Sequence, residues 1–255
     1  MGVDIAVGDL PRDYLAEAKS PPVAPPAAPR PRPEPEPPPP ARSAPSPSID
    51  ALERDAASAA AEANTLEELR AALERFDGCA LKTTATRLVF GDGEAGARAM
   101  FVGEAPGADE DRQGLPFVGR AGKLLNRMLG AIGLTRADVY IANVVPWRPP
   151  GNRTPSPLET AACLPFIQRQ IELVGPSVLV CLGAPSTQTL LGVKEGITRV
   201  RGRWLDYQCG DRPIRAMAML HPAYLLRRPA DKKLAWRDLR LLVRELERLR
   251  AESAP

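Results

Sequence analysis

Residues 103–119, GEAPGADEDRQGLPFVG, follow the run ARAMFV of residues 97–102 and precede the stretch KLLNRML of residues 123–129. The first run is typical of a strand that is buried in a parallel sheet, and the apolar spacing of the last stretch is typical of a helix. We therefore predict a strand, a long loop and a helix. Glycines in the loop let its backbone approach a ligand, and open α/β sheets bind ligands at such strand ends.

Three further apolar runs are typical of strands, at residues 139–145, 178–182 and 214–220. Helical patterns separate or follow the strands, at residues 122–133, 157–174, 185–191 and 231–251. Strands that alternate with helices predict an α/β fold, a three-layer αβα sandwich with a central four-stranded parallel sheet. Residues 87–90 are a candidate for an extra segment at the edge of the sheet.

The N-terminal quarter differs in composition from the rest of the chain. Residues 1–20 form a short segment of their own, and residues 21–48 hold 14 of the 29 prolines. We expect residues 21–64 to be a Pro/Ala-rich linker that is largely disordered, although the alanines of residues 49–63 favour a helix. Thr65 and Glu68 have the spacing of a helix start, so the folded domain is expected to span residues 65–252.

Composition bounds the kind of protein and its compartment. The chain has 255 residues, of which 44% are hydrophobic and 25% are charged, as in ordinary globular proteins. It has no apolar run long enough for a membrane span, no signal-peptide pattern and only four scattered cysteines, so we expect a cytoplasmic protein. The net charge of +3 is the sum of −4 over residues 1–65 and +7 over the remainder. The basic balance of the remainder gives weak support for a polyanionic partner.

Polar residues lie where the predicted strands end. Glu104 ends the first strand, Asn143 lies near the end of the second, and His221 follows the fourth. Because the carboxyl ends of parallel strands share one edge of a sheet, these side chains should converge. The sequence therefore predicts a single cleft, lined by Glu104, Glu110, Phe117, Asn143, Asn152 and His221.

Two of these residues carry the most specific chemistry. His221 is the only histidine of the chain. A neutral imidazole can donate a hydrogen bond to a developing oxyanion and an imidazolium can act as an acid, but a lone histidine can also be purely structural. Asn143 presents a donor and an acceptor on one planar amide, which is suited to reading the edge of a base. Its alternative is a buried amide that bonds to local backbone.

The other cleft residues are less specific. Phe117 offers a stacking face but is equally typical of a core residue. Glu104 and Glu110 can orient a water or cap the helix that is expected to start near residue 119. Arg148, Arg153, Arg227 and Arg228 flank the cleft and suit phosphates, although most exposed arginines are only solvated. The residues alone indicate a pocket for a planar ligand with basic walls.

Six motifs occur in order along the chain: GEAPG (103–107), GLPFVGRAG (114–122), YIAN (140–143), RPPGNR (148–153), RGRW (201–204) and HPAYLLR (221–227). Through them, residues 81–242 closely resemble the family 4 uracil-DNA glycosylases. The resemblance implies a uracil-DNA glycosylase-like fold and the hydrolysis of the N-glycosidic bond of flipped-out deoxyuridine in DNA. This reaction releases uracil and leaves an abasic site, as base excision repair requires.

The resemblance also implies roles for single residues. Phe117 would stack on the uracil ring, and Asn143 would bind its N3 and O4 edge and exclude cytosine. His221 and the backbone near Glu104 and Ala105 would support O2, where negative charge grows as the bond breaks. The best-known uracil glycosylases have an Asp where this chain has Ala105. The catalytic candidates are therefore Glu110 and Asn152 for placing the water, Glu104 for shaping the first motif, and His221.

Contacts with the rest of the DNA follow from the same motifs. The loop at residues 221–226 would insert into the duplex where the base has left. The residues that the resemblance implies for DNA binding are Arg148, Asn152, Arg153, Pro222 and Arg227.

The cysteines depart from the family pattern. Most members carry an iron–sulfur cluster on four cysteines, and only Cys79 and Cys163 match ligand positions of that cluster. The other two positions hold Phe76 and Trp147. We therefore predict that the protein has no metal and no cofactor, and that Cys79 and Cys163 are remnants of the ligand set. Phe76 and Trp147 are expected to fill the vacated volume.

Two alternatives belong to other classes of protein. One is a uracil-DNA binding protein with little or no turnover, which repeated release of free uracil would exclude. The other is an interaction protein whose active part is the proline-rich arm. The expected partner is uracil-containing DNA, single- or double-stranded, without a membrane, and the expected protein is a monomer of the bacterial cytosol.

Overall fold

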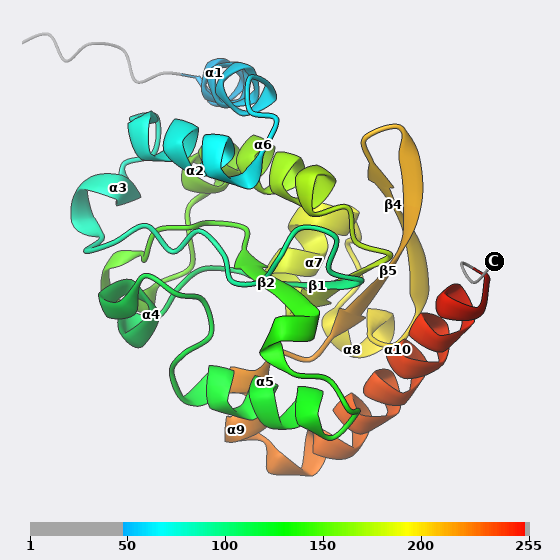
Figure 1. Ribbon diagram of the computed structural model, residues 1–255. Coiled ribbons are helices and arrows are strands. Elements are labelled where there is room, and N and C mark those ends of the chain that lie inside the picture. Colours follow the sequence, from blue (N-terminus) through cyan, green and yellow to red (C-terminus); the bar gives the residue numbers. More distant parts are fainter. Residues whose placement is uncertain (1–47, 253–255) are drawn as a thin grey trace, which may run out of the picture. The chain divides into compact units, whose positions relative to one another are not determined.

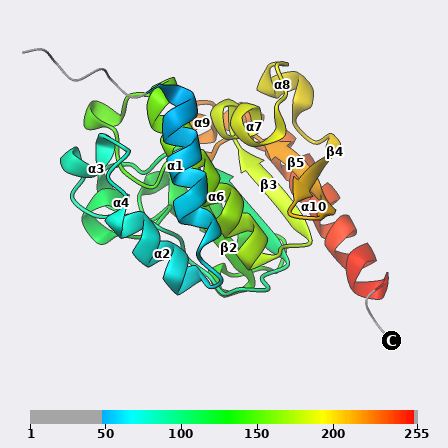
Figure 2. The same cartoon turned by 90° about the horizontal axis from the view of Figure 1, so that it is seen from above.

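The computed structural model describes residues 48–252. The expectations for residues 1–20 and for the proline-rich stretch 21–47 therefore lie outside the described residues. Within residues 48–252, a mixed five-stranded sheet lies between two layers of helices (Figures 1 and 2). None of the helices in this part combines the length and the apolar character that crossing a membrane requires.

The strand order of the sheet is β2 (Val139–Asn143), β1 (Ala99–Gly103), β3 (Val178–Leu182), β5 (Arg212–Met219) and β4 (Trp204–Cys209). The first four strands are parallel, as predicted, and every residue of β1, β2 and β3 is buried. The structure adds β4, which pairs antiparallel with β5 at the edge of the sheet. Only two of the six residues of β4 are buried, which explains why it has no continuous apolar run.

Residues 87–92 extend the other edge of the sheet. The amide of Val89 donates to the carbonyl of Pro146 at 2.9 Å, and Asp92 exchanges two backbone hydrogen bonds with Ile141 of β2. The candidate edge segment is therefore present, but its isolated antiparallel bridge is at Asp92, two residues beyond the expected range 87–90.

The side chains of alternate strand residues point to opposite faces of the sheet and form two hydrophobic cores. On one face the core is formed with α1 (Ile49–Ala61), α2 (Leu66–Arg75), α3 (Leu81–Thr84), α6 (Pro157–Val174) and α7 (Ala184–Leu191). On the other face it is formed with α5 (Arg120–Gly130), α9 (Pro222–Arg227) and α10 (Lys232–Glu252). The αβα layering follows, because each helix buries one apolar stripe against the sheet.

Shorter elements lie in the connections between the strands and the longer helices. They are α4 (Ala108–Gln113), α8 (Ile197–Val200) and the 3₁₀ turns η2 (Arg136–Asp138), η3 (Pro150–Asn152) and η4 (Pro229–Asp231). The stretch 103–119 is therefore not an uninterrupted loop, because α4 lies inside it. Asp109, Glu110 and Asp111 lie in the first turn of α4, where their negative charges interact favourably with the helix dipole.

Helix α1 packs on α6 and belongs to the fold, which therefore starts earlier than the expected boundary at residue 65. Leu52, Ala56 and Ala60 of α1 are buried, and the Arg169 guanidinium of α6 donates to the carbonyl of Ala63 at 2.8 and 3.0 Å. Small alanine side chains let α1 and α6 approach closely. An alanine-rich sequence that suggests a linker by composition thus forms a packed helix.

Candidate active site

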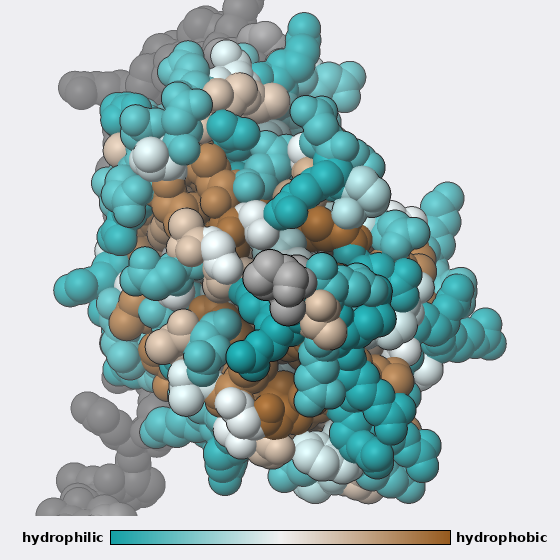
Figure 3. Space-filling model, turned by 45° about the vertical axis from the view of Figure 1, so that its right-hand side comes forward, coloured by the Kyte–Doolittle hydropathy of each residue, from teal (hydrophilic) through white to brown (hydrophobic). Residues whose placement is uncertain are grey.

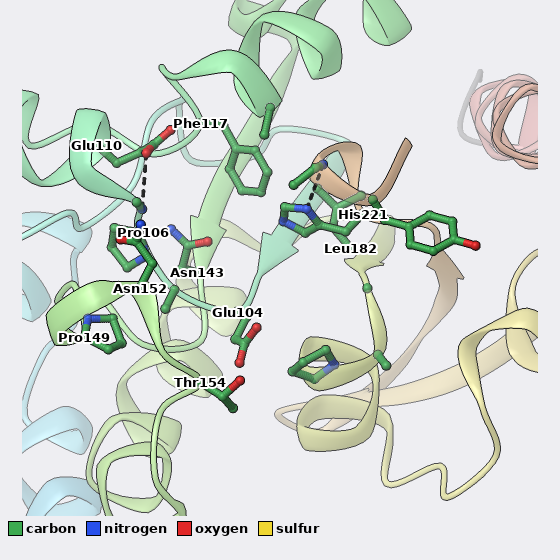
Figure 4. A pocket seen from close by; sticks show the side chains of 18 of the residues that line it. Glu104, Pro106, Glu110, Phe117, Asn143, Pro149, Asn152, Thr154, Leu182 and His221 are labelled. Carbon is green, nitrogen blue, oxygen red and sulfur yellow. Dashed lines mark hydrogen bonds between the residues drawn. The ribbon is translucent and has the colours of Figure 1, made fainter. Parts of the chain in front are cut away.

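A cavity of about 650 Å³ lies at the carboxyl ends of β1, β2, β3 and β5 (Figure 4). All six residues of the predicted cleft line it, which are Glu104, Glu110, Phe117, Asn143, Asn152 and His221. Ala105, Arg153 and Arg227 line it as well. Arg148 and Pro222 do not: Arg148 contacts Asn152 from outside, and Pro222 is buried in the first turn of α9. The fold has therefore gathered residues that are as far apart in the sequence as Glu104 and Arg227.

Glu110 holds the loop that carries Phe117. Its Oε1 accepts hydrogen bonds from the amides of Val118 (3.0 Å) and Gly119 (2.8 Å), and its Oε2 accepts one from the amide of Gly107 (3.2 Å). The carboxylate thus ties the start of α4 to the start of α5. Both of its oxygens are engaged, so its first role is to shape the wall of the cavity.

The backbone of Phe117 is held in an unusual conformation. Its φ of 53° lies in the left-handed region, which is strained for a residue with a side chain. Arg136 donates to the carbonyls of Phe117 (3.0 Å) and Pro116 (2.8 Å) and is itself paired with Asp92. The carbonyl of Phe117 packs against Gly122, where an added Cβ would lie 1.7 Å from its oxygen. These contacts fix the direction of the Phe117 ring.

Asn143 and Phe117 meet over the glycine that ends β1. A Cβ on Gly103 would lie 2.5 Å from the Asn143 Oδ1 and 2.8 Å from the tip of the Phe117 ring. The Asn143 side chain is buried, yet its amide makes no hydrogen bond with any residue of the described part. The amide atoms are not among the fully buried polar atoms that lack a partner, so they are open to the cavity that Asn143 lines. The structure therefore disfavours the alternative of an asparagine that bonds local backbone, and leaves the amide available to a ligand.

His221 caps α9 through one ring nitrogen. Its Nδ1 accepts a hydrogen bond from the amide of Ala223 at 3.0 Å, so in the neutral ring the proton is on Nε2. Burial, aided by the nearby Arg227 charge, lowers the pKa of His221 to about 4. Its ring lies 5.5 Å from the Phe117 ring, between centroids. At neutral pH the residue is thus an uncharged donor rather than an imidazolium.

Glu104 brings an unsatisfied oxygen to the cavity. Its Oε1 is buried and has no hydrogen-bond partner within the described residues. Burial raises the pKa of Glu104, and the Thr154 hydroxyl partly offsets that rise. Thr154 lines the same cavity but was not singled out in the sequence, because a threonine in a polar loop carries no specific signal. A buried carboxylate oxygen without a partner is a natural place for a water or a substrate group.

The loop after β2 presents Asn152 and Arg153 at the rim. Asn152 is exposed with a φ of 54°, and its Oδ1 accepts a hydrogen bond from the Arg148 Nε at 2.8 Å, which leaves its NH₂ group free. Arg153 is paired through both terminal nitrogens with Glu159 at 2.6 and 2.8 Å. Its charge is therefore largely compensated. Arg227 is exposed and forms no ion pair in the described part of the chain.

The four positions that the resemblance assigns to cluster ligands belong to one hydrophobic core. The Sγ atoms of Cys79 and Cys163 are 3.7 Å apart and both residues are buried. Trp147 is buried in the same core, and the Phe76 ring lies 5.0 Å from that of Phe166. Within residues 48–252, no group of three or more His, Cys, Asp or Glu side chains could hold a metal ion. Two thiols and two aromatic side chains do not fit a cluster that needs four thiolates.

Comparison with known proteins places this fold and site in a class. The family model of the Uracil DNA glycosylase superfamily matches residues 90–240. The Type-4 uracil-DNA glycosylase of Thermotoga maritima is 45% identical over 161 residues, which are 63% of this chain and 82% of the relative. The proteins of the same name from Archaeoglobus fulgidus and Sulfurisphaera tokodaii are 45% and 39% identical, over 59% and 72% of this chain and 78% and 85% of theirs. The chain belongs to the type-4 uracil-DNA glycosylase family.

Proposed function

We propose that this protein hydrolyses the N-glycosidic bond of deoxyuridine in DNA, which releases uracil and leaves an abasic site. The observation that carries the proposal is the convergence of three groups in one cavity: the Phe117 ring, the unpartnered Asn143 amide and the neutral His221 imidazole (Figure 4). The cavity lies at the bottom of a polar rim, so the nucleotide must leave the base stack to enter it.

Recognition of uracil would rest on stacking and on one amide. Phe117 offers its ring face to the base, at an angle set by Arg136 and Gly122. The Asn143 amide can accept a hydrogen bond from the N3–H of uracil and donate one to O4. Cytosine presents an acceptor at N3 and a donor at the amino group. The same amide orientation would therefore place acceptor against acceptor and donor against donor. The wrong base would leave buried polar groups unpaired.

Catalysis would rest on electrostatic stabilisation of the leaving uracil. As the bond to C1′ breaks, negative charge grows on the O2 of uracil and the sugar becomes oxocarbenium-like. The Nε2–H of His221 is a preorganised donor for that charge, and the backbone near Glu104 and Ala105 supports the same oxygen. Because the imidazole is neutral, it stabilises the uracil anion without first having to give up a proton.

The water that adds to C1′ needs an acceptor and a donor. The free Oε1 of Glu104 and the free NH₂ of Asn152 supply them, and both residues line the cavity. Glu110 would contribute through the loop, since its oxygens already accept three amide hydrogen bonds. This division differs from the sequence-based expectation, in which Glu110 and Asn152 place the water and Glu104 shapes the first motif.

We further propose that the protein works without an iron–sulfur cluster, as a monomer in the cytoplasm. The unsuitable ligand set supports the first statement. The four free cysteines, all buried, agree with a reducing compartment. Packing of Trp147 and the prolines of the RPPGNR motif would then give the rim loop the rigidity that cluster ligation gives other members.

Single-turnover release of uracil from an oligonucleotide with one uracil tests the proposal. The wild type should release one uracil per DNA molecule, and His221→Ala should be slower by a factor of about 100 to 1,000, as for other lost oxyanion donors. The wild type and His221→Ala should bind the abasic product DNA with similar affinity. A wild-type protein that binds the oligonucleotide without releasing uracil would instead be the uracil-DNA binding protein.

A further inference from the structure

Helix α10 presents a basic outer face. Its inner side is buried through Ala235, Asp238, Leu239 and Leu242. We call the exposed residues of its first four turns the α10 basic face: Lys232, Lys233, Trp236, Arg237, Arg240 and Arg244. Helical spacing places them on one side of the helix. Figure 3 turns the side of the molecule that carries α10 forward, and hydrophilic side chains cover much of it.

The cations of this face have no partners within residues 48–252. None of the five takes part in an ion pair or a side-chain hydrogen bond there. Arg248 on the last turns of the same helix behaves differently, because it pairs with Glu245 and Glu252. Asp238 faces inward and pairs with Arg201. Five unpaired positive charges along one face therefore remain for a partner outside the described fold.

Helix stability does not explain the face. The first turn of α10 carries Lys232 and Lys233 and no acidic residue, whereas the helix dipole favours acids at an N-terminus. Like charges three or four positions apart also repel one another. Asp231 directly precedes the helix and meets its dipole, so the repulsion among the cations of the face is the effect that a polyanion would offset.

Trp236 lies among these charges and is 44% exposed. It is one of only four large apolar side chains that are exposed in the part of the chain that the structure describes. An indole on a basic surface is suited to stacking on an unpaired base, which makes the face chemically complementary to DNA rather than to an acidic protein alone.

The α10 basic face continues the rim of the cavity. Arg227 lines the cavity, and the chain reaches α10 through Arg228 and η4. Hydrogen bonds fix this connection: the Tyr224 hydroxyl donates to Asp231 at 2.8 Å, and the Arg228 amide donates to the Tyr224 carbonyl at 2.8 Å. Only four residues, among them Arg228 and Asp231, separate Arg227 at the cavity from Lys232 at the start of the α10 basic face.

We propose that the α10 basic face binds the sugar–phosphate backbone of the DNA that flanks the flipped nucleotide. This inference rests on the proposed function. Lys232 to Arg244 span twelve helical rises, roughly 18 Å. That length matches about five base-pair steps of duplex DNA at 3.4 Å each. The contact would thus lengthen the binding site well beyond the nucleotide in the cavity.

A matched pair of triple variants tests the proposal. K233Q/R237Q/R240Q removes three charges from the face, and R54Q/R70Q/R75Q removes three from α1 and α2, across the sheet. Binding of an oligonucleotide of about 25 nucleotides is measured between about 50 and 200 mM salt. The first variant should bind at least tenfold more weakly at the lowest salt, with a slope of log Kd against log salt that is smaller by about 2 to 3. The second should match the wild type.

Kinetics supply the independent readout. With the long substrate, K233Q/R237Q/R240Q should raise KM and leave kcat unchanged, and with an oligonucleotide too short to reach α10 the difference from wild type should vanish. Equal effects of the two triple variants, or an unchanged salt slope, would overturn the proposal. Trp236→Ala should weaken binding of single-stranded DNA at least fivefold without changing the slope, because it removes no charge. Unchanged binding would remove the indole from the proposed contact.

The salt slope does not depend on turnover, so the two proposals can fail separately. If the wild type releases no uracil but the slopes behave as stated, the proposed reaction is wrong and the DNA-binding face stands. If uracil is released and the slopes of all three proteins agree, the reaction stands and the face is wrong.

Discussion

The Nδ1 of His221 accepts a hydrogen bond from the amide of Ala223 at 3.0 Å, which leaves the Nε2–H of the neutral ring for the cavity. Burial lowers the pKa of His221 to about 4, below its ordinary value of about 6.5. We therefore expect the rate of uracil release to show no loss with an apparent pKa near 6.5. A pH profile of single-turnover rates between about pH 5 and 8 checks this, and a fall centred near 6.5 would contradict a neutral donor.

The same depressed pKa has a consequence for stability. Between pH values of about 4 and 6.5 the unfolded chain binds a proton at His221 that the folded protein does not, so the free energy of unfolding should rise with pH across that window. His221→Gln should flatten this rise. The comparison is made by urea unfolding at several pH values, and an identical pH dependence in both proteins would show that His221 is readily protonated in the folded state.

Asn143→Asp should alter base recognition. A carboxylate cannot donate to O4, so release of uracil should fall by a factor of about 10 to 100, the effect of one unpaired buried group. The substitution keeps the size of the side chain, and Asn64→Asp in the exposed turn between α1 and α2, which does not line the cavity, is a matched control that should retain the wild-type rate. A wild-type rate for Asn143→Asp would mean that the amide does not read the base.

Gly122→Ala should destabilise the fold and displace Phe117, because the added Cβ would lie 1.7 Å from the Phe117 carbonyl oxygen. Overpacking of this kind costs about 1 to 3 kcal/mol. Gly130→Ala on the same helix is the control, since nothing lies within 4 Å of its Cβ. Thermal unfolding should show a lower Tm for the first variant and an equal or higher Tm for the second. Similar Tm values for both would exclude the close contact.

Removal of residues 1–47 should leave both uracil release and Tm unchanged, because α1 and its capping residue Ser48 remain. Removal of residues 1–64 should lower the Tm, since it deletes α1 and exposes the surface that Leu52, Ala56 and Ala60 cover. If the shorter deletion abolished uracil release, the arm would be part of the active machinery, as the interaction-protein alternative requires.

The purified protein should be colourless and free of stoichiometric iron, because two of the four ligand positions hold Phe76 and Trp147. Cys79→Ser should retain uracil release, with at most a loss of stability from the polar change in a buried site. Iron analysis and the absorbance at about 400 nm measure the cluster directly. Stoichiometric iron in the wild-type protein, or iron that is present in the wild type and absent from Cys79→Ser, would refute the proposal.

The sequence predicted most of what depends on regular patterns. Apolar runs located the four parallel strands, and the rule that their carboxyl ends share an edge was enough to bring Glu104, Asn143 and His221 into one cavity. Strand β4 was missed because it is half exposed, and α1 was missed as part of the fold because its alanines resemble a linker.

Features that depend on individual side-chain contacts could not be predicted from the sequence. No sequence rule indicates that Glu110 accepts three loop amides, that Glu104 keeps a free oxygen, or that Arg153 is paired with Glu159. These contacts arise from distances between loops that only the packed structure sets. They support the proposal that Glu104, rather than Glu110, contacts the water.

The most direct test of the central claim is the release of free base under multiple turnover, from one oligonucleotide with a single uracil and an otherwise identical one with cytosine. We expect many equivalents of uracil per protein molecule and no detectable cytosine. Equal release of the two bases, or no release from either at a protein concentration that fully binds the DNA, would contradict it.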